Sequence, residues 1–326
     1  MALKTVVIAG ASGFIGTHLV SALLCAGVPR IKVISRALRS EAAQAIWPAG
    51  VEIIRADLSD PDSLDGIFEA GCTVINLVYL RDAGEVDNVA AVEHLLAASR
   101  SAGVARIIHC STADVAGRTA DRRVTESTPC RPVTAYAITK LKMEAAVLAH
   151  GEDGGCDIAV LRPTAVFGPG GQNLRKLAQD TMGGSRWRNA VRAWVFGRRR
   201  MHLVYIDNVV AAIVFLAGTS RPLHREIFIV SDDDVPSNEF SSVESSMVRG
   251  LGTRTPLRPR IFLPSWALSL MLRTLGKDNV DPLRTYEPGK LRSWGFVPPV
   301  RFEDGLSRYA AWYRSEVSDR PGKAGP

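Results

Sequence analysis

The sequence has few cysteines, and none of them belongs to a recognisable pair or cluster. The five cysteines are an odd number and lie far apart along the chain. A disulfide framework needs paired cysteines, and a zinc site needs close spacings such as CxxC beside histidines, so neither is indicated and we expect no metal. Reduced thiols are typical of a cytoplasmic protein, which is the location that we expect.

Long apolar runs are missing as well. Hydrophobic residues make up 46% of the 326 residues and charged residues 22%, which is ordinary for a globular protein. No stretch reaches the roughly 18 uncharged apolar residues of a membrane span, and the amino-terminal apolar run is too short for a signal peptide. The nearest candidate, residues 261–272 (IFLPSWALSLML), contains Pro264 and favours a buried helix, with loose contact to a membrane surface as the alternative.

Nucleic-acid-binding motifs are also lacking, although the net charge is +7. The densest basic stretch, residues 186–200 (RWRNAVRAWVFGRRR), has no homeodomain, zinc-finger or RNA-binding motif beside it. We therefore do not expect nucleic acid as a partner. Such a cluster suits either a solvated surface or an anionic ligand such as a diphosphate.

Short apolar runs alternate with helical patterns in the first half of the chain. Runs that are apolar throughout indicate strands of a parallel sheet that is covered on both faces. Strands are predicted over Thr5–Ala9, Ile31–Ser35, Val51–Arg55, Thr73–Val78, Arg106–Cys110 and Asp157–Arg162, and helices over Phe14–Ala26, Val86–Ala102 and Asp207–Gly218. The pattern predicts an α/β fold with a doubly wound parallel-sheet Rossmann core and a smaller C-terminal substrate lobe.

The regularity weakens after Arg162, where prolines and glycines interrupt the pattern. We predict a dinucleotide-binding Rossmann domain over residues 1–165 plus about 204–218. The substrate-binding lobe is predicted over residues 166–203 plus about 219–318, followed by a flexible tail over residues 319–326.

Three glycines lie between the first predicted strand and the first predicted helix. The stretch GASGFIG places Gly10, Gly13 and Gly16 directly after an apolar run. Glycines at this point let backbone N–H groups and the helix N-terminus approach a pyrophosphate, although a tight turn also uses glycine. The position after a strand predicts a dinucleotide site.

No acidic residue ends the second predicted strand. An acid there would accept hydrogen bonds from the adenosine ribose and repel a 2′-phosphate. The chain has Ser35, Arg36 and Arg39 instead, which favours NADP(H), with NAD as the alternative and a solvated arginine as the plainer explanation. Asp57 follows the third strand and either accepts the adenine amino group or caps the next helix.

A tyrosine and a lysine lie four residues apart in TAYAITK. Tyr136 and Lys140 would therefore share one face of a helix. A nearby ammonium favours the ionised form of a phenol, so we expect Lys140 to lower the pKa of Tyr136 toward neutrality. The pair alone also fits an ordinary helix face.

Six motifs occur in the order and spacing of the extended short-chain dehydrogenase/reductase family, whose members are often described as NAD-dependent epimerases/dehydratases. They are GASGFIG, ADLSD, STADVAG, YAITK, LRPTAVFGPG and LVYIDNV. The resemblance implies that Tyr136 is the general acid/base and that Lys140 also binds the nicotinamide ribose. It implies that Thr112 holds the substrate oxygen, with Ser111 as the alternative, and that Asn88 is structural, a helix cap or part of a water relay.

The resemblance also implies further contacts. On the cofactor it adds Ser12, Phe14, Ile15, Leu58, Leu77, Arg162 and Pro163. Two positions where the family often has a substrate-binding asparagine and arginine are Ala165 and Met201 here. Asn173, Arg200 and Arg284 are therefore the predicted substrate contacts, the two arginines on an anionic group.

These residues together favour an NAD(P)-dependent oxidoreductase acting on a nucleotide-sugar carbonyl or hydroxyl, by 4-keto reduction, in surface polysaccharide biosynthesis. A nucleotide-sugar 4-epimerase, a reductase or dehydrogenase of a sterol- or flavonoid-like substrate, and a non-catalytic dinucleotide-binding protein are the alternatives. The family also implies a homodimer through the helices at Val86–Ala102 and Tyr136–His150.

Overall fold

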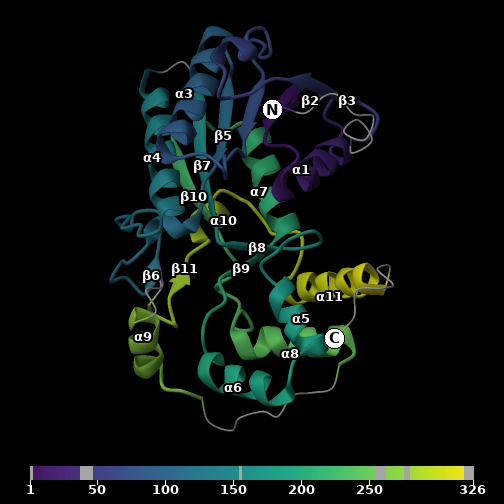
Figure 1. Ribbon diagram of the computed structural model, residues 1–326. Coiled ribbons are helices and arrows are strands. Elements are labelled where there is room, and N and C mark those ends of the chain that lie inside the picture. Colours follow the sequence, from purple (N-terminus) through teal and green to yellow (C-terminus); the bar gives the residue numbers. More distant parts are fainter. Residues whose placement is uncertain (1–2, 37–46, 154–155, 254–261, 275–279, 319–326) are drawn as a thin grey trace. The chain divides into compact units, whose positions relative to one another are not determined.

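The computed structural model describes residues 3–36, 47–153, 156–253, 262–274 and 280–318 (Figure 1). The chain forms two compact units. The first consists of the described parts of residues 1–115, 130–163 and 209–229, and the second of those of residues 116–129, 164–208 and 230–326. The tail that is predicted over residues 319–326 lies outside the described residues.

The first unit is built on a parallel sheet. Within the described chain this sheet has seven strands in the order β10-β7-β5-β4-β1-β2-β3. Each neighbouring pair from β7 across to β3 runs parallel. The strands are β1 (Thr5–Ala9), β2 (Arg30–Ser35), β3 (Val51–Arg55), β4 (Thr73–Asn76), β5 (Arg106–Cys110), β7 (Asp157–Pro163) and β10 (Glu226–Val230). The strand order reverses at β1 and β4, so the predicted doubly wound α/β sheet is confirmed.

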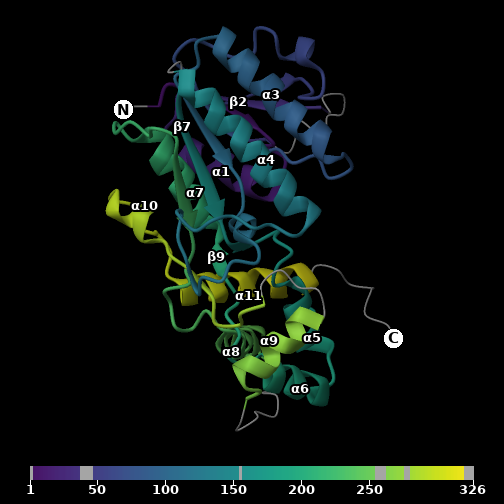
Figure 2. The same ribbon diagram turned by 90° about the vertical axis from the view of Figure 1, so that its left-hand side faces the viewer.

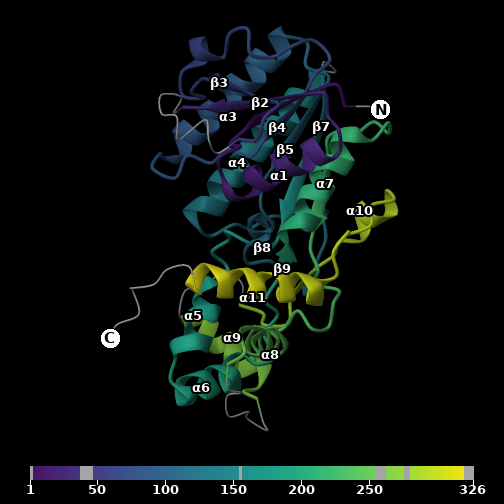
Figure 3. The ribbon, with the colours of Figure 1, turned by 90° about the vertical axis from the view of Figure 1, so that its right-hand side faces the viewer.

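Helices cover both faces of this sheet. Those beside the sheet are α1 (Phe14–Cys25), α3 (Glu85–Ser101), α4 (Ala135–His150) and α7 (Ile206–Gly218). Helices α3 and α4 lie on one face and are seen in front of the strands in Figure 2. Helices α1 and α7 lie on the opposite face (Figure 3). This double cover explains why the central strands β1, β4, β5 and β7 are almost entirely buried and mostly apolar.

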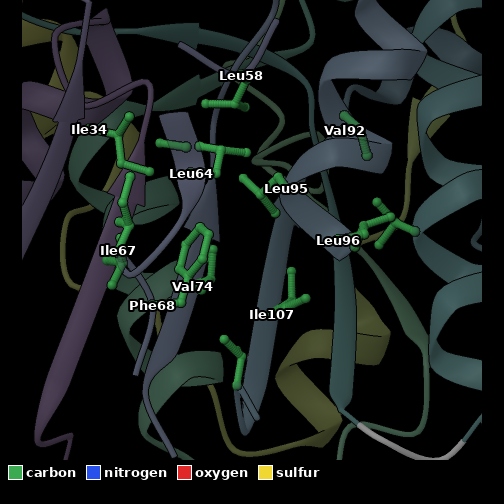
Figure 4. Close-up of a cluster of buried hydrophobic side chains, with 14 of the residues drawn as sticks. Ile34, Leu58, Leu64, Ile67, Phe68, Val74, Val92, Leu95, Leu96 and Ile107 are labelled. Atoms are coloured by element: carbon green, nitrogen blue, oxygen red, sulfur yellow. The ribbon is translucent and has the colours of Figure 1, made fainter. Parts of the chain in front are cut away.

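Apolar side chains fill the space between the sheet and α3. Figure 4 shows Leu64 and Phe68, from the segment after β3, beside Val74 of β4 and Leu95 of α3. Each of these four side chains is at most 6% exposed. This packing therefore fixes β4 against α3. The candidate site described below lies at the carboxyl ends of the central strands.

Strand β4 ends two residues earlier than predicted, at Asn76 rather than Val78. The Asn76 side chain explains the early end, because its Oδ1 accepts a hydrogen bond from the backbone N–H of Val78 at 3.0 Å. A side chain that bonds the backbone two residues on competes with the sheet ladder and turns the chain.

Residues 219–229 belong to the sheet unit, whereas the sequence places them in the smaller lobe. Strand β10 adds to the sheet beside β7, and no strand is predicted there. Residues 116–129 belong to the second unit, because β6 (Arg123–Val124) pairs in parallel with β11 (Thr285–Tyr286). Pairings between segments this distant in the chain are not encoded in local pattern.

The second unit contains a further parallel pair, β8 (Ala165–Phe167) with β9 (Leu203–Tyr205). Its helices include α5 (Arg175–Gly183), α6 (Arg186–Phe196), α8 (Phe240–Leu251), α9 (Ser265–Thr274), α10 (Gly289–Ser293) and α11 (Phe302–Ser318). Helix α11 packs closely on β9, since a Cβ added to Gly305 would lie 2.8 Å from the Tyr205 ring. No helix in the described part of the chain is long and apolar enough to cross a membrane.

A buried ion pair joins α4 to β7. The Arg162 guanidinium donates from Nη2 to Glu144 Oε2 at 2.6 Å and from Nε to Oε1 at 3.0 Å. The two side chains are only 7% and 1% exposed. The Arg162 side chain is therefore occupied by Glu144. Its backbone is the part of Arg162 for which a cofactor contact stays a prediction.

The substitution Arg162→Met leaves the Glu144 carboxylate buried without a partner. We expect the free energy of unfolding to fall by about 3–5 kcal/mol, because a buried charge without its counter-ion is costly. Urea unfolding followed by circular dichroism measures the fall. The double variant Arg162→Met with Glu144→Met is the control and should recover most of the stability. A double variant as unstable as the single one would contradict this explanation.

Candidate active site

The glycine loop forms a narrow backbone cradle at the start of α1. Gly10 has a φ of +85°, and a Cβ at this position would lie 3.0 Å from the carbonyl carbon of Leu77. A Cβ on Gly16 would lie 2.4 Å from the carbonyl oxygen of Ala11. Side chains are therefore excluded from both positions. A cradle of this kind at a helix N-terminus fits the pyrophosphate of a dinucleotide.

The remaining loop residues lie around this cradle. Ser12 and Gly13 are exposed, whereas Phe14 and Ile15 are half-buried in the first turn of α1. Leu77 lies directly beyond β4 and donates its N–H to Ala9 O at 2.9 Å. The predicted cofactor residues of this loop thus come together at the ends of β1 and β4.

The ends of β2 and β3 carry the residues that are predicted to meet the adenosine. Ser35 ends β2, and its carbonyl oxygen accepts a hydrogen bond from Ala56 N–H at 3.2 Å. Arg36 follows Ser35 and is exposed. Arg39 lies outside the described residues. One exposed guanidinium therefore lies directly after the strand end where the sequence lacks an acid.

Asp57 and Leu58 follow β3. Asp57 Oδ1 accepts a hydrogen bond from Ser59 N–H at 3.0 Å, so this carboxylate shapes the turn. The short helix after it has Asp60 as its N-cap, so the helix-cap alternative for Asp57 is wrong. Leu58 is only 5% exposed within the core, which leaves its backbone, not its side chain, for a cofactor contact.

Lys140 lies buried between the ends of two neighbouring strands. Its Nζ donates hydrogen bonds to Cys110 O, at the end of β5, at 3.1 Å, and to Val78 O, beyond β4, at 3.4 Å. The ammonium also lies 5.5 Å from the ring centre of Tyr79. Burial lowers the pKa of Lys140, because desolvation disfavours the charged form.

Tyr136 lies in the first turn of α4. The helix begins after Thr134, whose Oγ1 accepts a hydrogen bond from Ala137 N–H at 3.2 Å. The Tyr136 side chain is 38% exposed. Its ring meets the Tyr79 ring edge-on, with 4.8 Å between the centroids. A hydrogen bond also links its phenol to Thr112, so the structure brings the predicted catalytic residues together.

The pKa of Tyr136 is raised above its ordinary value, which corrects the prediction that Lys140 lowers it. Burial of the phenol is the largest cause, followed by the neighbouring Cys110 and Asp114. The hydrogen bond from Thr112 acts in the opposite direction and lowers the pKa. The Tyr136 phenol is therefore protonated at neutral pH.

Three residues of this site were missed by the sequence interpretation. Besides Tyr79, they are Asn76 and His109, both buried in the sheet. Asn76 Nδ2 donates to His109 Nδ1 at 3.2 Å. Burial lowers the pKa of His109 well below its usual value, so the ring stays neutral and Nδ1 can accept. In the sequence, a polar residue within an otherwise apolar strand could have pointed to both Asn76 in β4 and His109 in β5.

Asn88 and Ser111 complete the surroundings. Asn88 is 1% exposed, accepts a hydrogen bond from Leu80 N–H at 2.8 Å and donates to Leu80 O at 3.0 Å. It therefore fixes the loop after β4, as the structural interpretation predicts. Ser111 is buried, and its hydroxyl has no hydrogen-bond partner within the described residues. Pro163 ends β7 and is buried as well.

Two of the predicted substrate residues hold loops of the second unit. Asn173 Nδ2 donates to Val166 O at 2.7 Å. Arg200 Nη1 donates to Val235 O at 3.0 Å. Both side chains thus have structural partners, and their contact with a substrate stays a prediction.

Arg284, the third predicted substrate residue, is an internal anchor. It is 1% exposed and donates from Nη1 to Gly117 O and from Nη2 to Thr119 O, each at 2.7 Å. These bonds tie residues 116–129 to the rest of the second unit. Only Nε lacks a partner among the described residues, so the predicted contact with an anion stays a prediction for that atom.

A Rossmann sheet with a tyrosine and a lysine gathered at the ends of its central strands defines a dinucleotide-dependent enzyme of the short-chain dehydrogenase/reductase type. The chain belongs to the NAD dependent epimerase/dehydratase family, whose model matches residues 6–230. Both the predicted family and the prediction of an enzyme are confirmed by this match and by the relatives that follow.

One curated relative is the 4-hydroxy-2-methyl-3-oxo-4-farnesyl-3,4-dihydroquinoline-1-oxide ketoreductase of Stigmatella aurantiaca. It is 31% identical over 241 residues, which cover 69% of this chain and 67% of the relative. The dTDP-D-glucose 4,6-dehydratase of Mus musculus is 23% identical over 339 residues, covering 95% of this chain and 89% of the relative.

Among solved structures, the UDP-glucose 4-epimerase of Thermus thermophilus in complex with NAD superposes with a TM-score of 0.71. It is 21% identical and covers 95% of this chain and 99% of its own. At this identity the similarity supports the fold alone.

Replacing Tyr79 by Ala tests how the phenol is kept protonated. The ring of Tyr79 shields both Tyr136 and Lys140, so its removal admits water and should lower the pKa of Tyr136. An ultraviolet titration, taken as the difference from a matched Tyr136→Phe protein, reports ionisation of this one phenol. Tyr79→Phe keeps the ring and removes only the small charge effect of the Tyr79 hydroxyl, so it should lower the pKa of Tyr136 less than Tyr79→Ala does. A pKa that is unchanged in Tyr79→Ala would show that other groups desolvate Tyr136.

Proposed function

We propose that the protein is an NADPH-dependent reductase of a ketone, with Tyr136 as the proton donor. The observation that carries this proposal is the end of β2, where Ser35 and the exposed Arg36 stand in place of an acidic residue and suit the 2′-phosphate of NADPH, the cofactor of a reductase. Reduction of a carbonyl requires an acid that delivers a proton to the oxygen. The first step of an epimerase or a 4,6-dehydratase is an oxidation, which requires a base instead. The Tyr136 phenol holds its proton at neutral pH, as a proton donor must.

The glycine loop at Gly10 and Gly16 would hold a nicotinamide cofactor, which would supply the hydride. The chain's own residues then handle the substrate oxygen. The Thr112 hydroxyl orients this oxygen, and the O–H bond of Tyr136 breaks as a new O–H bond forms on the substrate. The phenolate that remains is stabilised by the Thr112 hydroxyl. Because Tyr136 is partly exposed, it regains its proton from water.

For the substrate we propose a 4-keto nucleotide sugar. The dehydratase and epimerase named above support this class by their names, and the basic residues of the second unit suit a diphosphate. A hydrophobic ketone is the second candidate. The 31% identical relative, named for a farnesylated dihydroquinoline oxide, favours it. The replacement of two expected polar positions by Ala165 and Met201 points the same way.

The setting that we propose is surface polysaccharide biosynthesis in the cytoplasm, by a homodimer. Helices α3 and α4, which pack against each other on one face of the sheet, are the proposed dimer surface.

Incubation with NADPH and a panel of ketones tests the reaction and the substrate together. The panel contains 4-keto and 4-hydroxy nucleotide sugars beside a long-chain alkyl ketone. We expect net oxidation of NADPH with a ketone and a loss of turnover on the order of 10²–10⁴-fold in Tyr136→Phe, because the proton donor is gone. Cofactor affinity should be nearly unchanged. Epimerised product without net cofactor oxidation would overturn the proposed reduction, and full activity of Tyr136→Phe would remove Tyr136 from the mechanism.

The cofactor preference is a separate prediction. If Arg36 binds the 2′-phosphate, fluorescence titration should give tighter binding of NADPH than of NADH. The substitution Arg36→Ala should weaken NADPH binding by about tenfold, since a charge-assisted hydrogen bond is lost, and should leave NADH binding unchanged. The exposed Arg55, at the end of β3, offers a matched control as Arg55→Ala. Equal affinity for the two cofactors in the parent protein would contradict the assignment.

A further inference from the structure

Helix α6 of the second unit presents large apolar side chains to solvent. Trp187 is 71% exposed, Trp194 43% and Val191 40%. The spacings of four and three residues place all three on one face of the helix. The opposite side of α6 packs inward, where Phe196 meets Phe240 of α8. The packing of α6 on the rest of the unit therefore does not use the exposed face.

Helix α9, whose leading segment is joined to α6, also exposes large apolar side chains. Trp266 is 72% exposed and Leu270 60%, and the two lie one turn apart. The segment that leads into α9 is joined to the end of α6, because Leu263 N–H donates to Trp194 O at 2.9 Å. Figure 1 shows α9 in the same unit as α6 but displaced to one side of it. Trp187, Val191, Trp194, Trp266 and Leu270 are called the tryptophan face below.

The charges on these two helices have one sign. Neither α6 (RWRNAVRAWVF) nor α9 (SWALSLMLRT) contains an acidic residue. Arg188, Arg198 and Arg273 are exposed on or directly beside them. Arg192 differs, because its guanidinium forms an ion pair with Asp180. The tryptophan face is thus bordered by exposed positive charge.

We infer that the tryptophan face docks the protein on an anionic lipid surface. Tryptophan side chains favour the boundary between headgroups and acyl chains, and arginine beside them binds lipid phosphate. An apolar patch with arginine but no acid matches that boundary. A second copy of the chain fits less well, since a two-fold contact would bring the exposed arginines of both copies into one interface without an acidic residue from either helix. The inference is independent of the proposed reaction.

Flotation of the full chain with lipid vesicles tests the inference. Vesicles of phosphatidylcholine alone are compared with vesicles of equal parts phosphatidylcholine and phosphatidylglycerol. We expect binding to the anionic vesicles, weakened by salt, with a blue shift of tryptophan fluorescence. The double variant Trp187→Ser with Trp266→Ser should bind at least about tenfold more weakly, and Arg188→Gln about fivefold more weakly.

Val297→Ser is the matched control, because Val297 is 79% exposed in the same unit but outside the tryptophan face. It should bind as the parent does, and circular dichroism checks that every variant is folded. Failure of the parent to bind anionic vesicles overturns the inference, as does unchanged binding by the folded double variant. Sedimentation equilibrium tests whether the tryptophan face instead joins two copies of the chain. A parent dimer that the double variant breaks, without vesicle binding, assigns the face to self-association and overturns lipid docking.

Discussion

The candidate site depends on one buried ammonium that two backbone carbonyls hold in place. Lys140 extends from α4 to the ends of β4 and β5, where Val78 and Cys110 accept its hydrogen bonds. Removing a lysine from water is costly, and carbonyl dipoles offset that cost only when they converge on the charge. Neighbouring parallel strands provide that convergence, because their carboxyl ends meet at one edge of the sheet.

Neutral polar groups support this arrangement from within the sheet. Asn76 bonds both to the backbone of Val78 and to His109, so it positions one of the two carbonyls that Lys140 uses. The neutral His109 accepts without placing a second positive charge beside the ammonium. The Tyr79 ring closes the same space from the side of the helix. These groups therefore keep water away from the Lys140 ammonium and still leave it the hydrogen bonds that a buried charge requires.

The sheet and the glycine loop could be predicted from sequence because each is encoded locally. Buried parallel strands are mostly apolar, and the cradle excludes Cβ atoms at Gly10 and Gly16. The direction of the pKa shift at Tyr136 could not be predicted in this way. It depends on burial by groups that are remote in the chain, and spacing within TAYAITK contains none of that information. The anchoring role of Arg284 was hidden for the same reason, since Gly117 and Thr119 lie far away in sequence.

The ion pair between Glu144 and Arg162 gives α4 a fixed angular setting. Tyr136, Lys140 and Glu144 follow one another at four-residue intervals, so they lie along a single stripe of the helix. Glu144 binds β7 at one end of that stripe, and Lys140 binds the ends of β4 and β5 in the middle. Because α4 is bound at both Lys140 and Glu144 on the same face, these contacts resist rotation of the helix about its own axis. The direction in which the Tyr136 phenol points therefore depends in part on Glu144, a carboxylate two turns away that is bound to Arg162.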